Sequence, residues 1–304
     1  MPIPAPNLTP PFNIVRLSHV ELRVTDLAWS RAYYVDTLGL QVTHEEPDAL
    51  YLRAMEERGH HSMILRRAAD PSVGTLGFKG WSEEDLDRAA HWFAGRGLPV
   101  AWTERPFMGR VLATRDPWGM PLEFYAKMDR LAPIHQQYRL YRGVKPLRID
   151  HFNLFSSNVD QAVEFYGDKG FRVTEYTADE ETGRTWAAWM HRKGGVHDIA
   201  FTNGTGPRLH HTAFWVPTPM NIIDLLDLMS TTGYLANIER GPGRHGISNA
   251  FFLYIRDKDG HRTEIYCSDY QTCDPDLEPI KWDLKDPQRQ TLWGAPAPRS
   301  WFEL

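Results

Sequence analysis

The chain has 304 residues, 42% hydrophobic and 24% charged, and its 34 Lys and Arg against 39 Asp and Glu give a net charge of −5 with His neutral. This composition is typical of a folded protein, and the length predicts two domains. No apolar run is long enough for a membrane helix and the start lacks a signal-peptide pattern, so we expect a cytoplasmic protein without a membrane partner. Mild acidity without basic blocks argues against a nucleic-acid partner. Two cysteines are too few for a disulfide-stapled scaffold.

The predicted elements begin with a strand in which Val20, Leu22 and Val24 share one face. Thr25 and Asp26 are N-cap candidates for a helix that follows. Ser157 and Asn158 are the corresponding candidates later in the chain, and Ser82 with Asp85 caps another helix. We expect further strands at 50–54, 61–66, 186–191, 197–202, 210–216 and 250–256, and helices near 82–95 and 219–232. The β-α-β-β-β order and the few long helices predict an α+β protein with mixed sheets.

The order of these elements is duplicated. SHVEL at 18–22 returns as DHFNL at 150–154, an offset of 132 residues. RDPWGMPLEFYA at 115–126 returns as RDKDGHRTEIYC at 256–267, an offset of 141 residues. Between these matches, 59–64 aligns with 195–200. The repeat predicts two domains of the same architecture.

Three possible metal ligands lie on three different predicted strands of the second copy: His151, His211 and Glu264. Two imidazoles and a carboxylate form the facial triad of non-haem Fe(II) oxygenases, which leaves adjacent positions open for substrate and dioxygen. The first copy keeps His19 and Glu123 at the equivalent positions, but Thr75 takes the place of His211. A single histidine is usually a hydrogen-bonded structural residue, whereas three matching positions favour a metal site. We therefore interpret the first copy as structural and the second as catalytic.

Several runs of the second copy carry a family resemblance: His151-Phe152-Asn153, the segments 187–193 and 196–198, the pair His210-His211, and the segments 239–246 and 259–266. They resemble the extradiol ring-cleaving dioxygenases of the vicinal oxygen chelate superfamily, and within these the homoprotocatechuate (3,4-dihydroxyphenylacetate) 2,3-dioxygenases. The resemblance implies four βαββ modules, two per domain, with half-open mixed sheets. It divides the chain into a structural copy (1–145), a catalytic domain (146–273) and a loop-rich tail (274–304) packing over the active site.

The resemblance also implies the roles of individual residues. Fe(II) or Mn(II) would be bound by His151, His211 and Glu264, with His197 as the acid/base. The remaining predicted site residues are Tyr254 and His245 as hydrogen-bond partners of the bound catecholate, Asn153 and Trp189 as residues lining the oxygen and substrate pocket, and Arg240 with His245, together with Arg289, as candidates for a substrate carboxylate. Relatives are tetramers, so we expect a homotetramer.

The expected activity is cleavage of a catechol, 3,4-dihydroxyphenylacetate, by dioxygen to a muconic semialdehyde in aromatic catabolism. One departure concerns the substrate: the family tends to have two consecutive arginines near the C-terminus, whereas here Gln290 follows Arg289. The chain also ends at Leu304, where relatives continue. Another catechol is therefore the first alternative. A glyoxalase-like metal isomerase and a metal-free binding protein are further alternatives on the same fold.

Overall fold

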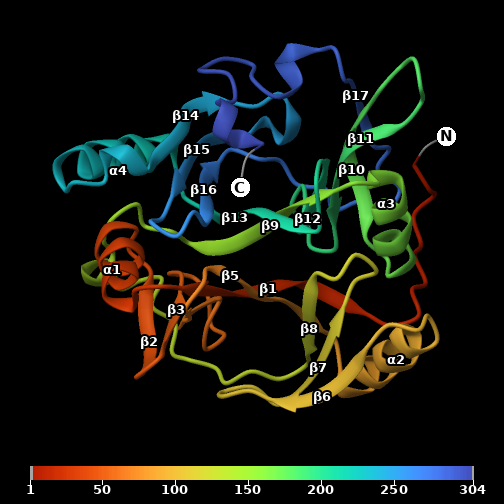
Figure 1. Cartoon of the computed structure of the whole chain (residues 1–304), viewed down its shortest axis with the longest axis horizontal. Coiled ribbons are helices and arrows are strands. Elements are labelled where there is room, and N and C mark those ends of the chain that lie inside the picture. The colour runs from red at the N-terminus through yellow and green to blue at the C-terminus, as the bar shows by residue number, and fades with distance from the viewer. Residues whose placement is uncertain (1–2, 303–304) are drawn as a thin grey trace.

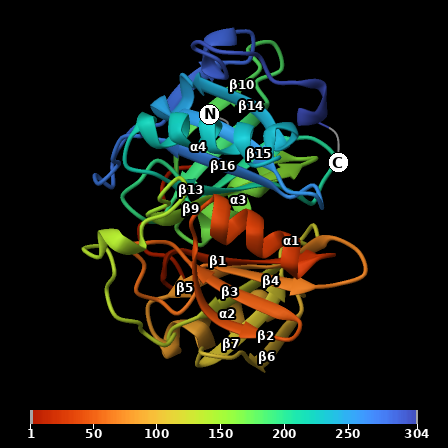
Figure 2. The same cartoon turned by 90° about the vertical axis from the view of Figure 1, so that its left-hand side faces the viewer.

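The computed structural model describes residues 3–302, and its two mixed sheets are stacked in two layers (Figure 1). The first sheet has the order β2-β3-β4-β1-β5-β8-β7-β6. Its strands are β1 (Ile14–Val24), β2 (Gln41–Glu46), β3 (Ala49–Arg53), β4 (Met63–Arg67), β5 (Ser72–Gly80), β6 (Val100–Glu104), β7 (Arg110–Arg115) and β8 (Pro121–Tyr125). This N-terminal domain forms the lower layer of both views (Figures 1 and 2).

The second sheet has the order β14-β15-β16-β13-β9-β12-β11-β10-β17. Its strands are β9 (Arg148–Ser156), β10 (Arg172–Ala178), β11 (Thr185–His191), β12 (Ile199–Asn203), β13 (Arg208–Trp215), β14 (Ile238–Arg244), β15 (Phe251–Arg256), β16 (Arg262–Cys267) and β17 (Ile280–Asp283). The two domains and their mixed sheets confirm the predicted fold class. The strands predicted from alternation correspond to β3, β4, β11, β12, β13 and β15.

The helices begin where the sequence places polar caps. They are α1 (Leu27–Arg31) with a π-helical continuation at Ala32–Thr37, α2 (Glu83–Ala94), α3 (Val159–Asp168) and α4 (Pro219–Thr231). Asp26, Ser82 and Asn158 each accept a backbone N–H of the helix they precede, as predicted. Short 3-10 turns lie at Tyr138–Leu140, Leu235–Asn237, Ile247–Asn249, Pro287–Arg289 and Arg299–Trp301. Within residues 3–302, no helix is long and apolar enough to cross a membrane.

Strand pairing confirms the alignment of the two copies. In the first sheet His19 on β1 pairs with Gly77 on β5, and Gly77 pairs with Glu123 on β8. In the second sheet His151 on β9 pairs with Ala213 on β13, and Ala213 pairs with Glu264 on β16. Thr75 and His211 each lie two residues before the middle partner. They are therefore equivalent, as the repeat predicts.

The core is shared between the domains. The Phe78 ring of β5 lies 6.2 Å from Phe152 of β9 and 5.8 Å from Phe171, both in edge-on geometry. All three side chains are buried in one apolar cluster that draws on both sheets. Apolar area removed from water at this junction stabilises the two domains as a unit, so the second sheet packs against the first copy.

Candidate metal centre and active site

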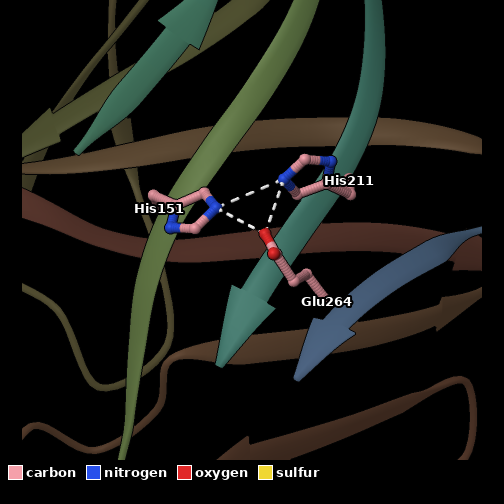
Figure 3. Close-up of side chains that lie close together, drawn as sticks. All are labelled: His151, His211 and Glu264. Carbon is pink, nitrogen blue, oxygen red and sulfur yellow. Dashed lines mark hydrogen bonds and ion pairs between the residues drawn. The ribbon is translucent and has the colours of Figure 1, made fainter. Parts of the chain in front are cut away.

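Three neighbouring strands bring the predicted ligands together (Figure 3). His151 Nε2 lies 3.2 Å from His211 Nε2 and 2.9 Å from Glu264 Oε2, and the distance from His211 Nε2 to Glu264 Oε2 is 3.1 Å. All three side chains are buried. Two imidazole nitrogens and a carboxylate oxygen thus converge on one point.

The donor set fits a divalent metal. Adjacent ligands at bond lengths of about 2.1 Å on an octahedral ion are separated by roughly 3 Å, which matches the three distances. Burial lowers the pKa of His211 to about 4 against the opposing effect of Glu264, so this imidazole is neutral at neutral pH. Burial alone would raise the pKa of Glu264, but hydrogen bonds from His151 and His211 hold it well below its ordinary value. A neutral imidazole and an ionised carboxylate are the forms that bind metal.

Asp150 contacts the first predicted ligand. Its Oδ2 lies 3.1 Å from His151 Nδ1 and also accepts a hydrogen bond from the Tyr266 hydroxyl, while Lys193 Nζ lies 2.8 Å from Oδ1. Burial raises the pKa of Asp150, but Lys193 and His151 outweigh it and keep the carboxylate ionised. A carboxylate on Nδ1 fixes the tautomer that presents Nε2 to a metal. We did not single out Asp150 from the sequence, although the repeat has a signal: the first copy has Ser18 at this position.

His210 is a second residue that sequence reasoning missed as part of the site. Adjacent strand residues normally face opposite sides, but the register of β13 on β9 shifts between Leu209 and His211. His210 consequently lines the same cavity, and its Nδ1 lies 2.6 Å from His211 Nδ1. The His-His pair is visible in the sequence, whereas the bulge that turns both rings inward is not.

The predicted acid/base and hydrogen-bonding residues surround the triad. The His197 ring lies 3.8 Å from the His151 ring, and burial lowers the pKa of His197 well below its ordinary value. The Tyr254 hydroxyl lies 3.1 Å from His245 Nε2. His245 Nδ1 hydrogen-bonds to the Gln290 carbonyl. Because a carbonyl only accepts hydrogen bonds, His245 Nδ1 carries the proton. Burial lowers the pKa of His245 to about 4, so the ring is neutral and its Nε2 accepts a hydrogen bond from the Tyr254 hydroxyl.

A cavity of about 170 Å³ adjoins the triad. Asn153 and Trp189 line it, and Asn153 Oδ1 accepts a hydrogen bond of 3.2 Å from the Thr202 hydroxyl. Residues that the sequence did not assign to the site also line it: Trp186, Ala187, Thr202, His210, Ile247, Ser248, Ala250, Leu284, Gln290, Trp301 and Phe302. The last four belong to the C-terminal tail. The tail sequence has no hydrophobic periodicity from which their place at the cavity could be predicted.

Arg240 and Arg289 place positive charge at the same cavity. Arg240 is only 3% exposed, and one of its terminal nitrogens donates to the Gln290 carbonyl and the Thr291 hydroxyl. Its Nε and Nη1 are buried and have no hydrogen-bond partner within residues 3–302. Arg289 donates from Nε to the Leu284 carbonyl at 3.1 Å. A buried guanidinium with unused donors favours an anionic ligand.

The equivalent place in the first copy is closed. His19 Nε2 lies 2.6 Å from Glu123 Oε1, and the Arg105 guanidinium lies 3.0 Å from the other oxygen of Glu123. The His19 ring also covers Gly77 so closely that a Cβ there would lie 2.1 Å from it. Thr75 supplies no second imidazole. The Arg105 guanidinium and the His19 ring thus occupy the space that the second copy keeps open.

The family described as the Glyoxalase/Bleomycin resistance protein/Dioxygenase superfamily matches residues 16–124 and 148–265. The chain belongs to this superfamily. The match occurs once in each copy, which confirms the internal repeat. Homoprotocatechuate 2,3-dioxygenase from Brevibacterium fuscum, solved as an anaerobic complex with 3,4-dihydroxyphenylacetate, is 44% identical in sequence to this chain. The two structures have a TM-score of 0.94, covering 99% of this chain and 94% of the other.

Two sequence relatives agree with this assignment. A metapyrocatechase of Geobacillus stearothermophilus is 31% identical, covering 96% of this chain and 94% of its own. A manganese-dependent 2,3-dihydroxybiphenyl 1,2-dioxygenase of Geobacillus genomosp. 3 is also 31% identical, covering 93% and 94%. The prediction of an extradiol ring-cleaving dioxygenase of the vicinal oxygen chelate superfamily is confirmed.

Proposed function

We propose that this dioxygenase cleaves a catechol whose ring substituent ends in a carboxylate, and we favour 3,4-dihydroxyphenylacetate as the substrate and a muconic semialdehyde as the product, within aromatic catabolism. The observation that carries the proposal is Arg240, whose buried Nε and Nη1 have no partner within the described chain and which lines the cavity of the triad. A carboxylate on the substrate would satisfy these donors. His245 and Arg289 line the same cavity. The Brevibacterium relative was solved with this compound bound.

We propose His151, His211 and Glu264 as the ligands of Fe(II) or Mn(II). Support comes from the convergence of their three donor atoms and from the relative described as manganese-dependent. The ion would supply a Lewis acid with adjacent open positions, which lowers the pKa of the catechol hydroxyls. Asp150 and His210 act through the Nδ1 atoms of the two histidines and hold both rings in place.

The proton chemistry falls to His197. Its buried imidazole is neutral and lines the cavity, so it can accept a proton from a catechol hydroxyl and return it as the O–O bond breaks. Tyr254 and His245 form a hydrogen-bonded pair that orients the ring oxygens, and Asn153 and Trp189 shape the cavity beside it. Positioning two reactants side by side supplies much of the rate enhancement.

The test is anaerobic loading of the protein with Fe(II) or Mn(II), followed by oxygen and a panel of catechols, with absorbance of the yellow ring-opened product as the readout. We expect 3,4-dihydroxyphenylacetate, the acid substrate, to show a lower KM than the uncharged 4-methylcatechol. Arg240→Met should raise the KM for the acid substrate about tenfold or more and leave the KM for the uncharged catechol nearly unchanged. Absence of product from every catechol with either metal would refute the activity.

Gln290 favours one alternative within the same chemistry. It lines the cavity beside Arg289, where an amide can hydrogen-bond a group that carries no charge. A catechol with a differently placed acid or a neutral polar chain would then have the lowest KM in the panel. The panel therefore includes acids of different chain length and the corresponding amides.

We also propose a cytoplasmic homotetramer, following the resemblance. Sedimentation equilibrium of the metal-loaded protein tests the assembly: a mass near four times 35.0 kDa would support it, and a monomer or dimer would refute it.

A further inference from the structure

Glu175 of β10 is a completely buried carboxylate that takes no direct part in the proposed chemistry. It accepts three hydrogen bonds from neutral donors: the Ser248 N–H at 2.7 Å, the Tyr270 hydroxyl at 2.6 Å and Trp282 Nε1 at 2.6 Å. The first two bind Oε1 and the third binds Oε2. Burial raises its pKa, but these three donors oppose that effect. A buried carboxylate satisfied in this way binds its donors more strongly than a neutral acceptor would.

The three donors come from separate segments. Ser248 belongs to the loop 244–250, Tyr270 follows the ligand strand β16, and Trp282 lies on β17, which pairs in parallel with β10. β17 is a short strand at the edge of the sheet, so the hydrogen bond from Trp282 Nε1 adds a buried side-chain contact to its main-chain pairing with β10. Glu175 therefore joins the loop and the tail at one point.

The loop and the tail form one wall of the cavity. His245, Ile247 and Ser248 line it from the loop, and Arg289 and Gln290 line it from the tail. They contact each other directly: the Gly246 N–H donates to the Gln288 carbonyl at 3.1 Å, and the Gln290 carbonyl accepts from His245 Nδ1. This wall, residues 244–250 with 282–290, contains His245 and Arg289, two of the groups proposed to bind the ring substituent, and the Gln290 carbonyl accepts a hydrogen bond from the third, Arg240. None of the triad residues belongs to it.

The backbone of the loop is strained where Glu175 holds it. Ser248 and Asn249 have φ values of +57° and +54°, a left-handed conformation that costs free energy for residues other than glycine. Gly246 packs against the tail so closely that a Cβ would lie 2.8 Å from the Trp282 ring. Without the carboxylate, the loop would lose the hydrogen bond that offsets this strain, and Trp282 would lose its partner.

We propose that Glu175 is a positioning residue that fixes this wall and thereby sets the affinity for the ring substituent. The proposal rests on the proposed function, because it assigns the wall to substrate recognition. The proposal predicts a selective effect. Disturbing Glu175 should weaken the binding of a catechol whose substituent reaches the wall, and it should change the binding of a catechol without such a substituent much less. The metal ligands lie on other strands and should keep their metal.

Glu175→Gln tests the proposal with almost no change in size. An amide must point its NH₂ group either at Trp282 Nε1–H or at the Ser248 N–H and the Tyr270 hydroxyl, so one donor always faces another. We expect the KM for the acid substrate to rise about tenfold or more, with unchanged metal content. The kcat, and the KM for the uncharged methylcatechol, should change little. Hydrogen exchange of the peptide 280–292 should become faster.

Trp282→Phe provides the conservative companion. It removes the indole donor, so in the double variant the amide of Glu175→Gln no longer faces an N–H there. We expect the double variant to have a KM within about threefold of Trp282→Phe alone, less than the two separate effects would give together. Trp282→Phe retains the carboxylate, and its own selective rise in KM still tests the wall if Glu175→Gln does not fold.

Asp116→Asn is the matched control, because Asp116 is also a buried carboxylate but binds the Trp118 and Met120 N–H groups in the N-terminal domain. It should affect both substrates equally or not at all. An equal change for both substrates in Glu175→Gln, or no change in either, would overturn the positioning role. Failure of the wild-type protein to cleave any catechol would instead refute the proposed function, so the two failures are distinguishable.

Discussion

His19 and His151 occupy equivalent positions on β1 and β9, yet their surroundings differ. His151 Nε2 faces a second imidazole and a carboxylate, whereas His19 Nε2 faces Glu123 alone, and Arg105 neutralises that carboxylate. We expect His151→Gln to lose more than about 90% of the bound metal and of kcat, because two protein ligands do not form the facial triad. Metal per folded chain, measured by plasma mass spectrometry after dialysis, checks this.

His19→Gln is the control for the same substitution in the other copy. It should retain one metal ion per chain and nearly full kcat, with some loss of stability from the broken pair with Glu123. Metal loss in both variants would contradict the assignment of the site to the second copy. His211→Ala should behave like His151→Gln.

His197 and His61 allow the same comparison for the proton role. Each is buried beside the histidine that begins its copy: the His197 ring lies 3.8 Å from His151, and the His61 ring lies 5.3 Å from His19. His197→Phe should keep the metal but lower kcat by about 10²- to 10⁴-fold, since an acid/base group contributes this much. His61→Phe should leave kcat unchanged. Single-turnover kinetics would show a slowed chemical step only in the first variant, and equal effects would argue that both rings merely pack.

The triad could be predicted because a repeat makes three residues comparable at once. The contacts around it depend on atoms that a single sequence does not place. His210 faces the site through a register shift, and Arg105 reaches Glu123 across a distance of 18 residues in sequence. Each is an ordinary polar residue in the sequence. The role of each residue follows only from the residue that it contacts in the folded structure.

At the scale of elements, close packing between β1 and β5 leaves no space for a metal site in the first copy. Gly77 lies directly beneath the His19 ring, while its counterpart Ala213 has room for a methyl group beside His151. Gly77→Ala should therefore lower the free energy of unfolding by about 1–3 kcal/mol, because the ring must move in a packed interior. Urea denaturation followed by circular dichroism measures this, and kcat per folded molecule should not change.

Gly167→Ala in α3 separates crowding from the effect of replacing glycine itself. Its nearest neighbour beyond the helix would lie 3.7 Å from the new Cβ, an ordinary contact. Alanine should be neutral or stabilising there by up to about 1 kcal/mol, since glycine is unfavourable inside a helix. If Gly77→Ala were equally benign, the first copy would have more space than its structure indicates.

Some of the strands that the sequence did not predict lack burial on one face. Strand β6 has side chains that are all exposed or partly exposed, so its sequence shows no apolar alternation. The segment 274–304 is expected to be a loop-rich tail, and the short strand β17 pairs there with β10. Its four residues are likewise exposed or partly exposed. A short edge strand is held by main-chain hydrogen bonds, which leave no trace in side-chain pattern.

At the scale of the molecule, Lys169 joins the two domains in an unusual way. It follows α3, is fully buried, and lies with Nζ 3.1 Å from the Phe165 ring centre, 4.2 Å from that of Tyr166 and 4.8 Å from that of Trp92, which comes from α2 of the other domain. Nζ also donates to the Phe165 carbonyl at 2.6 Å. Burial lowers the pKa of Lys169 well below that of an exposed lysine, so folding favours the neutral amine.

This shift gives the stability of the whole protein a defined pH dependence. Below the folded pKa both states bind the proton, and the full cost of burying the charge is present. Between the folded pKa and the unfolded value of about 10.4, the unfolded state binds more protons, so stability rises with pH by up to about 1.4 kcal/mol per unit.

Lys169→Met removes this contribution. The free energy of unfolding of the wild type relative to Lys169→Met should therefore rise as the pH approaches 10.4 and then level off, measured by urea denaturation at matched ionic strength. Parallel curves for the two proteins from neutral pH to above 10.4 would show that Lys169 stays charged in the aromatic cluster, and that cation–π contacts with both domains offset its burial.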